Sequence, residues 1–195
     1  MSISEMFGLA AGTIGVISSL PQSLKIRKSG SSAGVSRLTW LIMFVSGSFW
    51  LGYGIKTHSL SQEVSNAVAL ILISTVLIGI FGSSVTKAVV LIVAFAGFVF
   101  IATALPLTAL AIVLLLFAST RIPQVIASYR RYISGGPSAV SMHTWALSTL
   151  SGLIWLIYAV LAGRGVVELS ALSGITFGIA IMYFERSDRG LTEPE

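Results

Sequence analysis

Apolar stretches of about 20 residues recur along the whole chain, separated by short segments rich in Gly, Ser and charged residues. An α-helix needs roughly 20 apolar residues to cross the bilayer core, which is about 30 Å thick. Hydrophobic residues make up 55% of the chain and charged residues 10%, which does not fit a soluble surface. The pattern predicts an all-α integral membrane protein with spans at residues 5–24, 36–56, 61–82, 86–104, 107–127, 139–161 and 166–184.

Basic residues are unevenly distributed between the predicted loops. Seven spans place the termini on opposite faces, and the Lys and Arg residues then divide 10 to 2, with only Lys56 and Arg164 on the minority side. Short cytoplasmic loops carry the excess of basic residues in membrane proteins. We therefore expect a multi-pass protein of the plasma membrane, with its N-terminus outside and residues 186–195 as a cytoplasmic tail.

Charge and residue usage exclude several classes of function. The net charge of +5 is spread in short runs between apolar stretches, so we expect it to set topology and not to bind nucleic acid. The absence of cysteine excludes thiolate metal sites and thiol catalysis. The spans hold no nucleophile beside a base, and His58 and His143 lie at span ends without a second ligand. We expect that the protein is not an enzyme and that it binds no metal ion or cofactor.

The chain repeats itself at an offset of 105 residues. The motif Val-Ser-x-x-Thr-Trp begins at residues 35 and 140, and Ser-Gly-x-x-Trp-Leu-x-Tyr begins at residues 46 and 151. Residues 35–66 share 11 identities with residues 140–171 over 32 positions without a gap. Two Pro-Gln pairs, Pro21-Gln22 and Pro123-Gln124, align at an offset of 102. Spans one to three therefore correspond to spans five to seven.

A repeat of three spans needs a fourth span before the second copy can start from the same face. We therefore predict two parallel three-helix bundles joined by a linker helix, a 3-1-3 arrangement with a pathway between the copies. The first repeat covers residues 1–85, the linker helix 86–106 and the second repeat 107–185.

These features resemble the SWEET and PQ-loop transporter family: a Pro-Gln pair after the first span of each unit, the two shared motifs and the 3-1-3 layout. The resemblance covers nearly the whole chain. It implies an alternating-access transporter for a small polar solute, with a sugar moved by facilitated diffusion as the leading expectation. Two alternatives stay open: a proton-coupled PQ-loop amino-acid transporter, and a seven-span cargo-binding receptor. Fold alone does not determine the substrate. The expected partners are the lipid bilayer, the solute and, as an open alternative, further copies in a homo-oligomer, although two three-helix units in one chain need no dimer to form a pathway.

Asn66 is the first candidate for contact with the solute. Burying an unpaired amide costs about 2 to 7 kcal/mol, so we expect Asn66 to face a cavity or a partner. Trp50 lies at a similar depth, roughly 7 to 9 Å inside at about 1.5 Å per residue. An indole stacks on a sugar ring, and an amide donates to and accepts from hydroxyls. In the related transporters, a Trp and an Asn at this spacing line the sugar pocket. An interface Trp and an Asn that joins helices are the alternatives.

The second copy repeats the tryptophan but not the amide. Trp155 matches Trp50, whereas the position that matches Asn66 is Ala171. We therefore expect a lopsided pocket, and we add three hydroxyls as candidates, Ser46, Ser151 and Ser170. Ser170 also belongs to a stripe of small residues with Gly174 and Gly178, which favours helix packing.

Tyr53 and Tyr158 lie one turn outward of the paired tryptophans and are candidates for an outer gate. An aromatic belt at the membrane surface is the alternative. In single-unit relatives, an Arg and an Asp after this Tyr complete the gate. Lys56 and Thr57 follow Tyr53, and Gly163 and Arg164 follow Tyr158, so we expect the charged part of the gate to be missing.

Pro21 and Pro123 are candidate hinges because proline removes a backbone donor and allows a helix to bend. Gln22 and Gln124 are expected to hydrogen-bond the freed carbonyl groups. The alternative is a helix end before a basic loop.

Proton coupling requires an acid near the pathway. Glu63 and Glu168 are the only acids there, and both lie at the outer starts of spans, where the helix dipole also favours a carboxylate. No Asp, Glu or His lies in the middle of a span, and we expect no Lys or Arg within the membrane. This pattern favours facilitated diffusion.

Overall fold

The computed structural model of the chain describes residues 1–29, 37–82, 84–134, 140 and 142–186, without the side chains of residues 19–29, 37–39 and 80. The described chain is helical apart from short connections. Its elements are α1 (Ile3–Ser29), α2 (Arg37–Thr57), α3 (Leu60–Phe81), α4 (Val85–Ala104), α5 (Leu107–Ala118), the 3₁₀ turn η1 (Ser119–Arg121), α6 (Ile122–Ser134), α7 (Met142–Ala162) and α8 (Gly165–Arg186).

The helices coincide with the predicted spans, with differences at two places. α1 continues to Ser29, past the predicted end at residue 24, and the fifth span is the broken path α5–η1–α6, which ends at Ser134 and not at residue 127. Within the described residues, five helical stretches are long and apolar enough to cross a membrane. The chain is a multi-pass membrane protein. The predicted tail at residues 186–195 lies, except for Arg186, outside the described residues.

Local chemistry explains where several helices begin and end. Ser59 caps the start of α3 by accepting a hydrogen bond from the backbone N–H of Gln62, and Ser84 caps α4 in the same way. Gly82 follows α3 with a φ of 84°, a left-handed conformation that glycine adopts without a steric penalty. Pro106 precedes α5, where its missing N–H would have had no helical partner.

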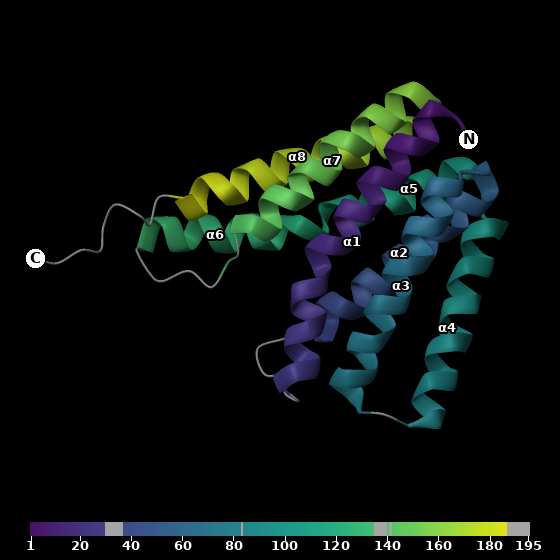
Figure 1. Cartoon of the computed structure of the whole chain (residues 1–195), viewed down its shortest axis with the longest axis horizontal. Helices are drawn as coiled ribbons and strands as arrows, with labels where there is room; N and C mark the ends of the chain where they lie inside the picture. Colours follow the sequence, from purple (N-terminus) through teal and green to yellow (C-terminus); the bar gives the residue numbers. More distant parts are fainter. Residues whose placement is uncertain (30–36, 83, 135–139, 141, 187–195) are drawn as a thin grey trace, which may run out of the picture.

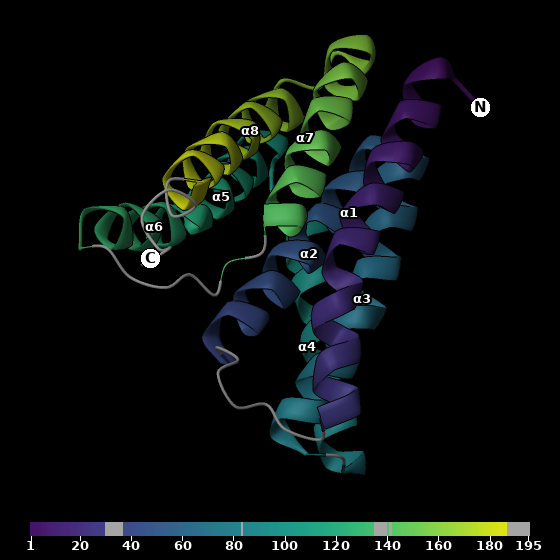
Figure 2. The same ribbon diagram turned by 60° about the vertical axis from the view of Figure 1, so that its left-hand side comes forward.

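Helix packing divides the molecule into two groups. In the first group α3 packs against both α1 and α2, and α4 packs against α2; in the second, α8 packs against α7 on one side and against α5 and α6 on the other. The groups meet where α1 lies along α7 and where α2 contacts α5 (Figures 1 and 2). In both views the groups are close where α1 begins, which we call the N-terminal end, and diverge toward the opposite end.

The apolar core follows this division. One cluster of buried side chains lies within the first group, between α2, α3 and α4, and includes Trp40 and Phe44. A second cluster includes Phe49, Tyr53, Leu110 and Tyr158 and joins the two groups at the N-terminal end. The N-terminal end is therefore closed by packed side chains from both groups.

Small residues allow α1 to approach α3 closely. A Cβ atom added at Gly8 would overlap the side chain of Ser61, and one added at Gly12 would overlap that of Ser65. Lipid tails are as apolar as core side chains, so helices in a membrane associate mainly through such close packing. We infer that Gly8 and Gly12 determine how tightly the first group packs.

This inference predicts the effect of adding one methyl group. Gly8→Ala should lower the melting temperature of the purified protein in detergent by several degrees, because overpacking costs about 1 to 3 kcal/mol. Gly97→Ala is the matched control, because a Cβ atom added at Gly97 meets nothing within 4 Å. The control should melt at or slightly above the wild-type temperature, since alanine favours helix over glycine. Equal melting temperatures for the two variants would contradict this account of the packing.

Candidate functional site

A cavity of about 410 Å³ lies between the two groups of helices. Side chains from α1, α2, α3, η1, α7 and α8 line it, so both halves of the repeat contribute to one space. Ligand pockets usually have volumes of about 300 to 1,000 Å³, which makes this cavity large enough for a small polar solute.

Six of the seven predicted pocket residues line this cavity. Trp50 and Asn66 come from the first copy, and Trp155 and Ala171 from the second, together with Ser151 and Ser170. Ser46 is not among the described lining residues.

The two tryptophans are held in the same way. Trp50 lies edge-on to Tyr53 with 5.6 Å between ring centroids, and Trp155 lies edge-on to Tyr158 with 5.2 Å. Such edge-to-face geometries stabilise aromatic pairs by about 0.5 to 1.5 kcal/mol. Each indole is therefore supported from the N-terminal end by the tyrosine one turn away.

The amide of Asn66 lies next to a second amide that the sequence did not single out. Asn66 Nδ2 donates to the backbone oxygen of Gln62 at 2.8 Å and to Gln62 Oε1 at 3.1 Å. Gln62 is almost completely buried and also lines the cavity. In the register of the repeat it matches Val167, so the second copy lacks both amides. The contacts fix the orientation of Asn66 and leave its Oδ1 with no partner in the described chain.

The serine hydroxyls of the second copy differ in their bonding. Ser151 Oγ donates to the backbone oxygen of Ala11 at 2.8 Å, a bond that ties α7 to α1 across the two groups. Ser170 Oγ is buried without a hydrogen-bond partner among the described residues, although it borders the cavity. A buried unpaired hydroxyl is costly, so Ser170 is the serine better placed to meet a ligand.

Arg121 is another lining residue that the sequence analysis did not predict. We expected no basic residue within the membrane, because Arg121 lies near a span end and was counted with a basic loop. The fifth span instead continues to Ser134, which moves Arg121 away from the helix end and into the cavity wall. Its Nη1 donates to the backbone oxygen of Gly174 at 3.0 Å, and its guanidinium lies 6.0 Å from the ring of Trp145.

Tyr53 and Tyr158 are buried at the N-terminal end, and each contacts a residue from the other half of the repeat. Tyr158 Oη lies 2.6 Å from Ser59 Oγ, and the hydroxyl of Tyr53 interacts with the guanidinium of Arg164. Ser59 and Arg164 occupy matching positions of the repeat, so the two contacts are related by its symmetry.

Two charged side chains, Arg164 and Glu5, extend these contacts. Arg164 Nη2 donates to the backbone oxygen of Thr57 at 2.8 Å. Glu5 accepts from Ser59 Oγ at 3.1 Å and from the backbone N–H of Ser61 at 2.5 Å. Glu5 belongs to α1 and is distant in sequence from both tyrosines, and Arg164 immediately precedes α8. Lys56 instead donates to the backbone oxygen of Thr103 at 3.0 Å, at the end of α4.

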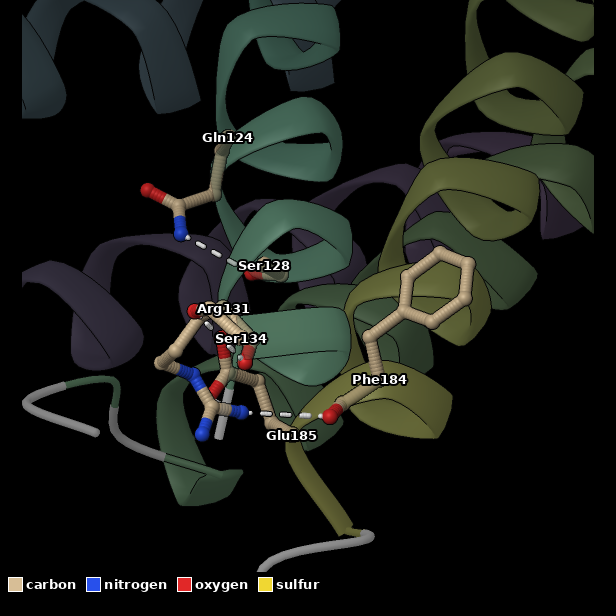
Figure 3. Close-up of polar contacts among 6 residues, drawn as sticks. All are labelled: Gln124, Ser128, Arg131, Ser134, Phe184 and Glu185. Atoms are coloured by element: carbon tan, nitrogen blue, oxygen red, sulfur yellow. Dashed lines mark hydrogen bonds and ion pairs between the residues drawn. The ribbon is translucent and has the colours of Figure 1, made fainter. Parts of the chain in front are cut away.

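The second Pro-Gln pair follows a break in the fifth span. Pro123 lacks the N–H that would bond to the oxygen of Ser119, and the N–H of Ile122 bonds to that oxygen instead, which produces the 3₁₀ turn η1. Gln124 Nε2 donates to Ser128 Oγ at 3.2 Å and not to a freed carbonyl group (Figure 3). The backbone at Pro21 and Gln22 is helical within α1, and their side chains lie outside the described part.

An ion pair connects the second helix group at the opposite end. Arg131 Nη2 lies 2.6 Å from Glu185 Oε2 and 3.1 Å from the backbone oxygen of Phe184, so α6 is tied to the end of α8 (Figure 3). Breaking such a pair by removing one partner would leave a buried charge. Neither residue lines the cavity. Glu63 and Glu168 are also absent from the described lining.

Comparisons with known proteins agree with this architecture. The sequence profile of the PQ loop repeat family matches residues 3–62. The sugar transporter SemiSWEET of Bradyrhizobium diazoefficiens is 30% identical over 74 residues, which is 38% of this chain and 86% of that protein. The structure of a eukaryotic SWEET transporter superposes with a TM-score of 0.73 at 16% identity, covering 96% of this chain and 99% of the other. The chain therefore belongs to the SWEET and PQ-loop family of membrane proteins.

Proposed function

We propose that this protein is a membrane transporter that binds one small polar solute, most simply a sugar, in the cavity between the two helix groups. The observation that carries the proposal is the pairing in that cavity of two indoles, Trp50 and Trp155, with the amides of Asn66 and Gln62. Stacked indoles suit the C–H faces of a sugar ring, and amides suit its hydroxyls. The name of the SemiSWEET relative, a sugar transporter, supports the same substrate class.

We assign the helices to two parallel units of three spans. In this proposal α1, α2 and α3 form the first unit, α4 is the linker, and α5–η1–α6, α7 and α8 form the second. The packing supports it, because α3 contacts both other helices of its unit and α8 does the same in the second. The contacts between the units, α1 with α7 and α2 with α5, also match each other under the repeat.

The difference between the two ends supports alternating access. The buried tyrosines and their partners close the N-terminal end, whereas the helix groups diverge at the opposite end (Figure 1). With the N-terminus outside the plasma membrane, as the basic residues predict, this arrangement corresponds to an inward-facing state. Opening the outer end would require Tyr158 to leave Ser59 and Arg164 to leave Thr57. The 3₁₀ turn before Pro123 supplies a place where the fifth span can bend.

Facilitated diffusion is the mode of transport that the cavity favours. Proton coupling needs a carboxylate or histidine in contact with the pathway, and neither lines the cavity within the described chain.

A receptor for cargo with a carboxylate is the second candidate function, and the position of Arg121 in the cavity wall is the observation that favours it. Net uptake of a solute distinguishes a transporter from such a receptor.

Substitution of the paired aromatic and amide groups tests the proposed site. Asn66→Ala and Trp50→Ala should each reduce uptake of the transported sugar into proteoliposomes about tenfold, which corresponds to about 1.4 kcal/mol of lost binding. Thr176→Ala is the control, because Thr176 is exposed and bonds only to the oxygen of Leu172 in its own helix. A pH gradient should leave the uptake rate unchanged. Wild-type uptake by both Asn66→Ala and Trp50→Ala would rule out this site.

The tyrosine contacts at the N-terminal end predict a second result. The chain has no cysteine, so a single Ala69→Cys change places one thiol in the cavity wall. Tyr158→Phe should increase labelling of this thiol by an impermeant maleimide added on the N-terminal side about fivefold, because a hydrogen bond contributes about 1 kcal/mol. Tyr183→Phe, at an exposed tyrosine, should label at the unaltered rate. Equal labelling rates for Tyr158→Phe and Tyr183→Phe would show that the hydroxyl of Tyr158 does not keep this end closed.

A further inference from the structure

Arg121 is a cation in the wall of the cavity, and the proposed sugar site does not explain its charge. We propose that the natural solute carries a carboxylate, as an acidic sugar does, and that the guanidinium of Arg121 binds it. This inference rests on the proposed function, because it specifies which class of solute the same cavity accepts.

The guanidinium is held so that part of it remains available. Nη1 donates to the backbone oxygen of Gly174, and a Cβ atom added at Gly174 would lie 3.0 Å from that nitrogen, so glycine makes room for the side chain. The guanidinium carbon lies over the ring of Trp145, 6.0 Å from the ring centroid, in a cation–π contact. Arginine has five N–H donors in a planar fork that matches a carboxylate. Within the described residues only the bond to Gly174 is made, and Arg121 borders the cavity.

The charge of Arg121 has no opposite charge nearby in the described chain. No acid lines the cavity there; Glu5 is bonded to Ser59 and Ser61, and Glu185 pairs with Arg131. A cation inside a membrane protein normally pairs with an anion or lines an ion or substrate pathway. A solute carboxylate would supply the missing negative charge and would displace water from the fork.

A purely structural role accounts for the position of Arg121 but not for its charge. A bond to the oxygen of Gly174 would brace the turn η1 against α8, and a neutral donor could make the same bond. The ring of Trp145 attracts the charge in a cation–π contact but carries no negative charge that would neutralise it. The charge is neutralised only if a ligand or another ionised group meets it, and no ionised group does so among the described residues.

The polar groups of the two copies also differ in a way that suits a solute with two different ends. The amides of Gln62 and Asn66 belong to the first copy, where residue 19, the match of Arg121 in the register of the Pro-Gln pairs, is a serine. The second copy has Val167 and Ala171 instead of the amides. An acidic sugar offers hydroxyls to the amides and a carboxylate to Arg121. Ser170, whose buried hydroxyl has no described partner, borders the same cavity.

The test compares three probes that share one ring and differ in charge: glucose, glucuronate and glucosamine. Binding to the purified full chain is followed by tryptophan fluorescence, because Trp50 and Trp155 line the cavity. We expect glucuronate to bind about tenfold more tightly than glucose, which corresponds to about 1.4 kcal/mol, and glucosamine to bind more weakly than glucose. Arg121→Gln should bring the three affinities close together.

Two further variants serve as controls for the Arg121→Gln variant. Arg121→Lys keeps the charge without the fork, so it should retain a reduced preference for glucuronate even if Arg121→Gln fails to fold. Arg130→Gln removes a charge from an exposed position on α6 and should keep the full preference. Glucose binding without a preference for glucuronate, or an unchanged preference in Arg121→Gln, would overturn the inference and leave the proposed sugar site standing. Binding of none of the three probes would overturn the sugar site and this inference together.

Discussion

The bilayer imposes the constraint on which the rest of the structure depends: inside it, a polar group must find a partner in the protein or face a cavity that water and solutes can enter. Backbone groups meet this requirement by forming helices. Polar side chains gather at two places that matter for the pathway, the contacts around Tyr53 and Tyr158 at the N-terminal end and the cavity between the helix groups. At the first place nearly every polar group is bonded to another. At the second, Asn66 Oδ1, Ser170 Oγ and part of Arg121 lack partners in the described chain, which is what a binding site for a polar solute requires.

The repeat explains the symmetry of the structure. The positions at which its two copies differ explain the function that we propose. The symmetric features are those that hold and close the cavity: the Trp–Tyr pairs, and the contacts of each tyrosine with residue 59 or 164 of the other copy. The asymmetric features are the polar groups that would bind the solute: two amides in the first copy and one guanidinium in the second. The repeat supplies a common frame for the pathway, and differences at a few lining positions are enough to distinguish its two sides.

The sequence predicted the spans and the tryptophans that line the cavity because both depend on local patterns: the length of an apolar stretch and a motif that repeats without a gap. Arg121 was missed because its place depends on where the fifth span ends, and span ends are the least certain part of a hydropathy pattern. Gln62 was missed for the same reason, since it lies near the start of α3. The contact of Glu5 with Ser59 and Ser61 joins residues more than fifty positions apart, so no local sequence pattern predicts it. The position of Ser46 away from the lining depends on a helix rotation that the motif does not specify.

The central claim is that one solute binds between the two copies, with its hydroxyls at the amides and its ring between the indoles. The most direct measurement is an experimental density map of the protein with its transported solute bound. The account predicts one solute per chain between Trp50 and Trp155, within hydrogen-bonding distance of Asn66. Density for the solute outside this cavity, or equivalent density at two sites related by the repeat, would contradict it.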